Sequence, residues 1–308
     1  MPGWSEILSK SNAAGIDPQQ QLVFLDGLRQ SYFSALFEHT GRNVIAYYSS
    51  WLTKPAVPDV SINEKDKSAF MCAVHKLDKS KGLDLILHTP GGDLAATESL
   101  MDYIHSVFNG DVRAIIPQIS MSGGSIMALS CKEIIMGKQS SLGPIDPQIG
   151  GVACQAVIDE FEMAKAEVKS NPHALGLWQA IISKYTPTFI IACMNAISWS
   201  EILAKKWITD PKPEINKDSF SSMFLNHADS KSHSRHISAK ECKSIGLNIL
   251  EMESDQMLQD LILSIHHCYM ILFERALATK IVENHASGRF VQQHAPPPPV
   301  SGIRPVMM

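Results

Sequence analysis

The stretch "PQISMSGGSIMALS", residues 117–130, passes from an apolar segment through a Gly-Gly pair into a run of small and apolar residues. The residues that lead into it, "DVRAIIPQIS" (111–120), are typical of a buried strand, and "SIMALSCKEI" (125–134) is typical of a helix. Ser122 lies between the two. The stretch therefore predicts a strand–turn–helix unit with a serine hydroxyl at its turn.

Strands and helices are predicted to alternate on both sides of this unit. "LDLILHT" (83–89) reads as a buried strand that ends at Pro-Gly-Gly, and residues 95–108 predict the helix that follows it. Such alternation favours an α/β fold built from parallel βαβ units. The other predicted elements are a strand at 43–51, helices at 17–38 (weakly interrupted at Gly27), 61–77 (with Ser61 as a cap), 236–247 and 255–284, and a largely helical region at 155–207.

The composition indicates a folded protein without features of a nucleic-acid or membrane protein. The chain has 308 residues, of which 45% are hydrophobic and 19% charged, so it can bury a sizeable core. Its net charge of -4 gives no electrostatic footprint for nucleic acid. The first residues show no signal-peptide pattern, and no apolar run approaches the ~18 residues that span a bilayer. We therefore expect a soluble, cytoplasmic protein with no membrane span and no nucleic-acid partner.

The six cysteines are scattered along the chain and form no CxxC pair. This spacing favours reduced, mostly buried thiols over a disulfide framework or a zinc site. We expect no bound metal and no cofactor.

Ser122 stands where acyl-transfer chemistry needs a nucleophile. Such chemistry also requires a base, a group that orients the base, and donors for the oxyanion. A helix that begins after Gly123-Gly124 would offer free N–H groups beside the hydroxyl. Ser120 is expected inside the strand and Ser125 as the N-cap of the helix. A plain turn without catalysis is the alternative.

The Pro-Gly-Gly turn after residues 83–89 offers a second set of backbone donors. Pro90 fixes one φ angle, and Gly91 and Gly92 can adopt angles closed to other residues. In parallel sheets, ligands bind at the carboxyl edge of the strands. Both glycine turns are therefore expected to face one cleft.

Three motifs in this order, "HTPGG" (88–92), "SMSGG" (120–124) and "LGPIDPQIGG" (142–151), resemble those of the serine dehydrogenase proteinase family. That family is similar to the Clp peptidases and the signal peptide peptidase A class. The resemblance covers residues 43–250. It implies a ClpP/crotonase-like layered βαβ fold, with helices added at both ends, and a serine-type endopeptidase that works through an acyl-enzyme.

Carried over to this sequence, the resemblance implies five site residues. Ser122 is the nucleophile, and the backbone N–H groups of Gly92 and Gly123 form the oxyanion hole. The family's Ser, Asp, His order implies Asp146 as the orienting carboxylate and His233 as the base. His233 lies in "SHSRHISAKECKSIGL" (232–247), where Ser234 replaces the aspartate that the family often has.

Several alternatives stay open for the base. His236 is a neighbour of His233 in the same segment. Relatives of the signal peptide peptidase class use a Ser–Lys dyad, for which Lys165 and Lys169 are candidates. Metal binding is a further alternative for the group His227, Asp229, His233 and His236, in which a His-x-x-His spacing occurs.

The resemblance also implies that an extended peptide or protein substrate binds as an added β-strand. The residues implied to line that groove are Gly91, Asp93, Leu94, Gly150 and Gly151. A flexible loop without a binding role is the alternative for the glycine pair.

We divide the chain into an N-terminal helical extension (1–42), a peptidase domain (43–250), a C-terminal helix (251–288) and a flexible Pro-rich tail (289–308). The apolar side of the helix at 255–284 is expected either to form an assembly surface or to cap the core. Folds of this class assemble, so we expect a homo-oligomer.

Two other classes of function fit the same motifs. A crotonase-like acyl-CoA enzyme would use the paired N–H groups to stabilise an enolate. A non-catalytic or latent scaffold of the same fold would bind peptides without turnover.

Overall fold

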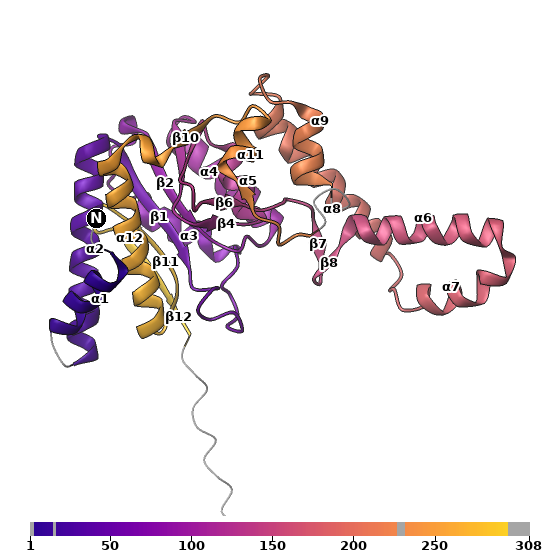
Figure 1. Ribbon diagram of the computed structural model, residues 1–308, viewed down its shortest axis with the longest axis horizontal. Helices are drawn as coiled ribbons and strands as arrows, with labels where there is room; N and C mark the ends of the chain where they lie inside the picture. The colour runs from indigo at the N-terminus through magenta and orange to yellow at the C-terminus, as the bar shows by residue number, and fades with distance from the viewer. Residues whose placement is uncertain (1–2, 15–16, 227–231, 295–308) are drawn as a thin grey trace, which may run out of the picture.

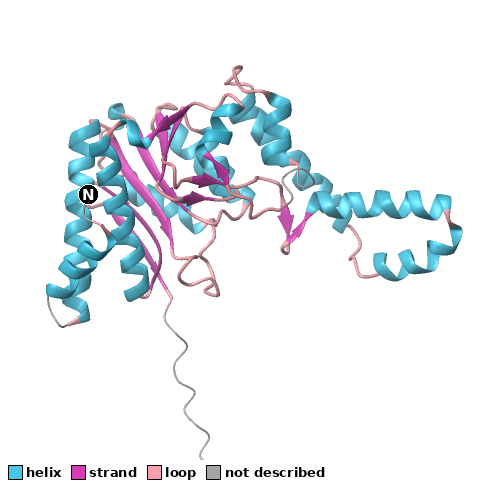
Figure 2. Ribbon diagram, in the orientation of Figure 1, coloured by secondary structure: helices cyan, strands magenta, loops and turns pink. Residues whose placement is uncertain are grey.

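A mixed seven-stranded sheet forms the centre of the protein (Figures 1 and 2). The computed structural model describes residues 3–14, 17–226 and 232–294. Strands run in the order β10-β5-β3-β2-β1-β11-β12; neighbours from β10 to β1 are parallel, and β11 and β12 are antiparallel additions. Their bounds are β1 Asn43–Ser49, β2 Leu83–His88, β3 Val112–Ile116, β5 Glu133–Met136, β10 Ile249–Glu251, β11 Ala278–Asn284 and β12 Arg289–Gln293. The predicted α/β class is confirmed.

Helices cover both faces of this sheet. One face packs against α3, α4 and α5, and the other packs against α2 and α12, which lie side by side (Figure 1). Within the described residues no helix is long and apolar enough to cross a membrane. The helices are α1 Trp4–Ala13, α2 Pro18–Thr40, α3 Lys65–Val74, α4 Leu94–Val107, α5 Gly123–Ser130, α6 Cys154–Ser170, α7 Leu175–Ile182, α8 Phe189–Ala204, α9 Lys217–Phe220, α11 Ala239–Ser244 and α12 Gln256–Arg275.

Alternate residues of the central strand β1 enter two different cores. Ile45 and Tyr47 pack toward α3 and α4, whereas Val44, Ala46 and Tyr48 pack toward α2 and α12. A strand that is buried on both faces needs apolar residues at every position. This requirement explains why the predicted strands read as continuous apolar runs.

Helix α2 has clear start and stop signals. The Asp17 side chain accepts a hydrogen bond from the Gln19 N–H at 3.1 Å, and Pro18 occupies the first helical position. Gly41, with a φ of 67°, ends the helix in the left-handed conformation. The helix predicted at 17–38 is confirmed, and it continues to Thr40 without a break at Gly27.

The C-terminal prediction of one helix through residue 284 is wrong beyond Arg275. Residues 278–284 form β11, which pairs with β1, and residues 289–293 form β12. β11 is buried along its whole length, so its sequence has no alternation that would separate a strand from a helix. The strands fall in the segments predicted as a C-terminal helix (251–288) and a Pro-rich tail (289–308); residues 295–308 lie outside the described part of the chain.

The apolar side of α12 caps the core rather than forming an outer surface. Leu258, Leu261, Ile262, Ile265 and Leu272 are at most 8% exposed, and they pack with residues of α2 and the sheet. An assembly surface on this side of α12 is therefore not available in the folded chain.

Three smaller predictions also need correction. α3 begins at Lys65, so Ser61 is not its cap; instead, Ile62 forms a β-bridge with Gly92. The strand predicted at 111–120 is split into β3 and the short β4 (Ile119–Ser120). The helix predicted at 125–134 ends at Ser130, and Glu133 begins β5.

The smaller strands form a three-stranded and a two-stranded sheet beside the main one. β4 pairs with β6 (Ser141–Leu142), which pairs with β9 (Ile237–Ser238), and β7 (Gln148–Ile149) forms a hairpin with β8 (Val152–Ala153). The region predicted as helical at 155–207 is confirmed. Helices α6 and α7 form an arm that projects from the body (Figure 1). Short helical turns are η1 Lys79–Lys81, η2 Pro172–Ala174, η3 Lys205–Thr209, η4 Ser221–Leu225 and η5 Met252–Ser254.

Two histidines are buried between the sheet and α12. His88 is 0% exposed and stacks on Tyr48, and the Tyr48 hydroxyl lies 3.2 Å from Nδ1 of His266. Burial lowers the pKa of His88 to about 4. Burial, followed by the charge of His88, lowers the pKa of His266 well below its usual value. Both side chains are therefore neutral in the folded protein at neutral pH.

These histidines predict that the protein loses stability in mild acid. Below the ordinary histidine pKa of 6.5, the unfolded chain binds protons at His88 and His266 that the folded chain does not bind. The free energy of unfolding should fall as the pH falls from 6.5 toward 4, by on the order of 1 kcal/mol per pH unit for each histidine. Urea unfolding at several pH values measures this slope. His88→Gln should make it shallower; an unchanged slope would contradict the assignment.

Candidate active site

Ser122 occupies a strained turn between β4 and α5. Its φ and ψ are 50° and -119°, a backbone conformation that residues other than glycine rarely adopt. Strain of this kind costs roughly 1–3 kcal/mol and concentrates at functional sites. The same strand–turn–helix geometry exposes the nucleophile in serine hydrolases. Ser122 is the residue immediately before Gly123, the first residue of α5.

The Pro-Gly-Gly turn lies directly against the Ser122 turn. A Cβ atom at Gly91, whose φ is +87°, would lie 2.5 Å from the Met121 carbonyl oxygen and 2.6 Å from Cβ of Ser122. Only glycine allows this approach. The two glycine turns, which are separate in the sequence, therefore pack directly against each other.

The N–H groups of Gly92 and Gly123 are suited to bind an oxyanion. A Cβ atom at Gly123 would lie 3.3 Å from the Gly92 nitrogen, so the two turns bring these groups close together. The hydrogen bonds of the bridge between Ile62 and Gly92 use the Gly91 carbonyl and the Asp93 N–H. The Gly92 N–H takes no part in this bridge. Across the described ranges, neither the Gly92 nor the Gly123 N–H donates a hydrogen bond to the protein.

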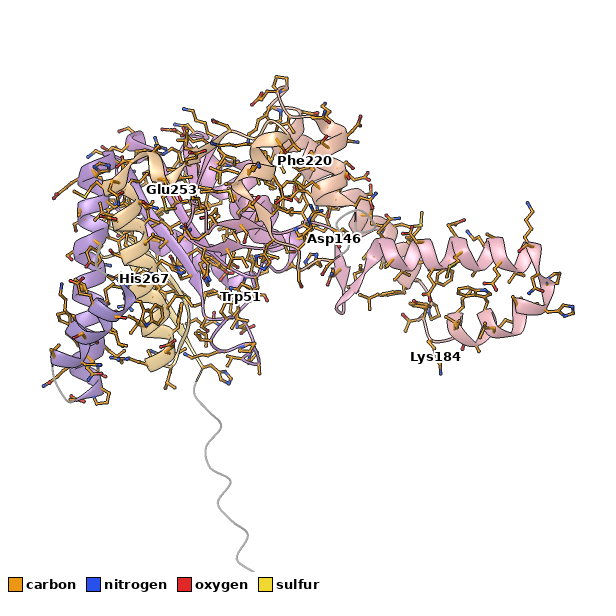
Figure 3. All side chains as sticks on the ribbon, viewed as in Figure 1. Trp51, Asp146, Lys184, Phe220, Glu253 and His267 are labelled. Atoms are coloured by element: carbon orange, nitrogen blue, oxygen red, sulfur yellow. The ribbon has the colours of Figure 1, made fainter. Side chains whose placement is uncertain are left out.

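Asp146 and His233 form a hydrogen-bonded pair. Nδ1 of His233 lies 2.7 Å from Oδ1 of Asp146, although the two residues are 87 positions apart. The Asp146 side chain is 1% exposed and that of His233 is 24% exposed. A buried carboxylate that holds Nδ1 fixes the ring and leaves Nε2 as the basic nitrogen. Asp146 lies on the side of the body from which the arm extends (Figure 3).

One cavity of about 520 Å³ connects these groups. Ser122, Gly92, Gly123 and His233 all line it. Among the described residues, Ser122 and His233 share no hydrogen bond. Catalytic hydrogen bonds are often long or open before substrate binds, so this geometry is compatible with a serine–histidine pair. The roles of these residues stay predictions.

The alternative bases have other partners or lie elsewhere. Nδ1 of His236 is 2.8 Å from the Ser141 hydroxyl. Lys165, on the arm, pairs with Glu162 at 2.6 Å with its side chain 70% exposed, and Lys169 lies on the same helix. Neither lysine lines the cavity of Ser122. His227 and Asp229 of the alternative metal group lie outside the described residues, and within those residues no group of His, Cys, Asp and Glu has a metal-binding arrangement.

The neighbouring serines have different environments. Ser120 lies in β4, as expected, and its buried hydroxyl finds no partner in the described part of the chain. The prediction of Ser125 as an N-cap is wrong: it lies inside α5, donates to the Ser120 carbonyl at 2.8 Å and accepts from the Gly143 N–H at 2.9 Å. Burial raises the pKa of the free thiols Cys131, Cys154, Cys242 and Cys268 to about 12, which makes them poor nucleophiles at neutral pH.

The predicted groove residues lie partly around the same cavity. Asp93, Leu94 and Gly151 line it, whereas Gly91 and Gly150 are not among its lining residues. Asp93 also caps α4 through a 2.8 Å hydrogen bond from the Ala96 N–H. Further lining residues, which the sequence analysis did not single out individually, are Ser61, Ile126, Ile145, Ala196, Trp199 and Ser200.

The contact between the two turns predicts a large effect of Gly91→Ala. The new Cβ would combine an unfavourable φ with overpacking against Met121 and Ser122, so we expect a loss of about 2–4 kcal/mol in the free energy of unfolding. Gly150→Ala is the matched control, because its φ is +61° and a Cβ there meets no atom within 4 Å. Urea unfolding compares the two variants. Equal losses in both would show that the contact with Ser122 has no energetic weight.

Comparison with known proteins relates part of the chain to a family. Residues 50–185 match the family described as ClpP-like SDH-type serine proteinase. Two uncharacterized proteins of Methanocaldococcus jannaschii are similar to the chain. One is 27% identical over 188 residues, which are 61% of this chain and 60% of the relative. The other is 35% identical over 100 residues, which are 32% of this chain and 34% of the relative.

The alignments therefore span less than two thirds of either relative. The matched segment 50–185 contains both glycine turns, Ser122 and Asp146, and it ends before His233. Through this segment, the chain is similar to the ClpP-like SDH-type serine proteinase family.

Proposed function

We propose that the protein is a serine endopeptidase of the Clp class in which Ser122 is the nucleophile, His233 the base and Asp146 the orienting carboxylate. The observation that carries the proposal is the sharing of one cavity. A strained serine, two N–H groups that donate to no acceptor among the described residues, and a histidine bonded to a buried aspartate all meet there. These are the components that acyl transfer requires.

In the acylation step, the Ser122 oxygen attacks the carbonyl carbon of the scissile peptide bond, and its proton moves to Nε2 of His233. The carbonyl oxygen becomes an oxyanion, and the N–H groups of Gly92 and Gly123 stabilise it. Asp146 holds Nδ1 of His233 and favours the imidazolium. When the intermediate collapses, the C–N bond breaks and the leaving amine takes the proton from His233.

In the deacylation step, His233 removes a proton from water, and the resulting oxygen nucleophile attacks the acyl-enzyme ester. The same two N–H groups bind the second oxyanion. Collapse breaks the ester bond, returns the proton to Ser122 and releases the new carboxylate. No metal or cofactor takes part in this scheme.

The substrate in this proposal is an extended segment of a peptide or protein. Gly151, in the turn of the β7–β8 hairpin, and Asp93 and Leu94, at the start of α4, all line the cavity. A chain laid between them would pair through its backbone, which gives affinity with little sequence preference. Trp199 and Ile126 add apolar surface to the same cavity.

A latent form of the same site is the second candidate. The observation in its favour is the missing hydrogen bond between Ser122 and His233 within the described residues. In that form, substrate or a partner would have to close the last contact. A crotonase-like acyl-CoA enzyme is less well supported, because it would use the N–H groups but leave the Asp146–His233 pair without a role.

The wider setting of the enzyme also belongs to the proposal: a cytoplasmic homo-oligomer. The support for assembly is the projecting arm (Figure 1), on which Met163, Leu175 and Leu177 are 57%, 48% and 61% exposed. Exposed apolar residues gathered on a projecting element are typical of contact surfaces.

Labelling with a fluorophosphonate probe tests the nucleophile. The probe reacts with an activated serine, so wild-type protein should be labelled and Ser122→Ala should not. Ser120→Ala is the matched control, because this neighbouring hydroxyl has no partner among the described residues and its loss disturbs no hydrogen bond there. Loss of label in Ser120→Ala but not in Ser122→Ala would refute the assignment of the nucleophile.

The histidine is tested by rates on a peptide substrate. His233→Ala should lower kcat by on the order of 10³-fold or more, since it removes the general base. His236→Ala, which loses only the contact with Ser141, should keep kcat within a few-fold of wild type. Equal losses would contradict the choice of His233, and a folded wild type that neither labels nor turns over would favour the latent scaffold.

A further inference from the structure

A buried ion pair lies behind the Pro-Gly-Gly turn. Nζ of Lys280, in β11, is 2.8 Å and 3.0 Å from the two carboxylate oxygens of Asp66, in α3. The two side chains are 0% and 1% exposed. Burial lowers the pKa of Lys280, and the carboxylate beside it acts in the opposite direction. A buried pair is a poor source of stability compared with apolar residues of the same size, so its other contacts are of interest.

Two of those other contacts are made to the chain segment 61–63. The third hydrogen bond of Lys280 goes to the Ser61 carbonyl at 2.8 Å. Asp66 accepts from the Asn63 N–H at 3.0 Å and from the Tyr47 hydroxyl at 2.8 Å. The ammonium group uses its three donors, and the pair holds the segment at both ends.

The middle residue of this segment, Ile62, lies against the turn that carries one oxyanion donor. Its N–H donates to the Gly91 carbonyl at 2.7 Å, and its carbonyl accepts from the Asp93 N–H at 3.0 Å. A Cβ at Gly92 would lie 2.3 Å from the Ile62 oxygen. The Ile62 backbone therefore supports Gly92 from behind and fixes the planes of the peptide groups on both sides of it.

We propose that Lys280 and Asp66 are positioning residues, which hold segment 61–63 so that the Gly92 N–H is directed into the cavity. The inference rests on the proposed function, in which that N–H binds the oxyanion. Neither side chain lines the cavity, so both act through the backbone of Ile62.

A second buried pair on the same strand supplies a matched control. Glu283 binds Arg29 at 2.5 Å, also accepts from the Tyr269 hydroxyl, and has a side chain that is 0% exposed. Because side chains alternate along a strand, Glu283 faces α2 and α12, on the side of the sheet away from segment 61–63. Its loss costs stability without touching the Pro-Gly-Gly turn.

The test compares Lys280→Met with Glu283→Gln in the full chain. Both variants should lower the midpoint of urea unfolding. Only Lys280→Met should lower kcat on a peptide substrate, by roughly 10- to 100-fold with KM within about twofold, because a displaced oxyanion donor weakens the transition state and not substrate binding. Amide hydrogen exchange in residues 60–66 and 89–94 should be faster in Lys280→Met and unchanged in Glu283→Gln.

A third variant separates positioning from stability. The double variant Asp66→Asn with Lys280→Met removes both charges, so no unpaired charge remains buried. It also replaces Lys280→Met in the test if that single variant does not fold. This double variant should be more stable than Lys280→Met and should still have low kcat. Wild-type kcat in either variant, or a loss in kcat that Glu283→Gln shares, would overturn the inference.

Failure of the proposed function gives a different pattern. A wild type without labelling or turnover would refute the peptidase, and hydrogen exchange then decides on the positioning role alone. Equal exchange in residues 89–94 of wild type and Lys280→Met would overturn that role.

Discussion

The contact between the backbones of Gly91 and the Ser122 turn is the constraint on which the rest of the site depends. Parallel strands β2 and β3 bring the two turns to the same edge of the sheet. This shared position alone does not fix the distance between the two turns. Because a Cβ at Gly91 would come within 2.7 Å of the Gly123 nitrogen, only glycine fits at position 91. That contact sets the distance between the Gly92 and Gly123 N–H groups, which in the proposed function bind the oxyanion.

The middle of the fold could be predicted from the sequence, and its edges could not. β1, β2, the start of β3 and α4 follow one another with turn residues between them, so local patterns are sufficient. β5 and β10 are only 4 and 3 residues long, and they are strands because they pair with neighbouring strands. β11 was predicted as helix because residues such as Ile281 and Val282 are buried on opposite faces, which removes the period of two. Pairing partners of this kind are set by tertiary structure.

The residues of the site that could be predicted from the sequence alone are those that have a signal in their own short segment. Ser122, Gly91, Gly92 and Gly123 carry their own turn signals. The expected partners Asp146 and His233 came from resemblance, since no pattern in the sequence connects residues 87 positions apart. Segment 61–63 was predicted as the start of a helix, although it forms the bridge behind Gly92. Lys280 had no signal at all, because a lysine in an apolar segment is ordinarily taken for an exposed residue.

The backbone, more than the side chains of the proposed catalytic residues, is the part of this site that is fixed before substrate binds. The Ser122 φ of 50°, the glycine contacts and the Ile62 bridge all restrict peptide groups, and peptide groups move only when whole segments move. The Asp146–His233 pair restricts one imidazole ring, and its last contact, to Ser122, is still open. Preorganised donors stabilise charge without reorganisation at the moment of reaction, whereas a serine–histidine contact can form as substrate excludes water. In the proposed peptidase, the oxyanion hole is therefore ready before substrate binds, and proton transfer is the step that substrate completes.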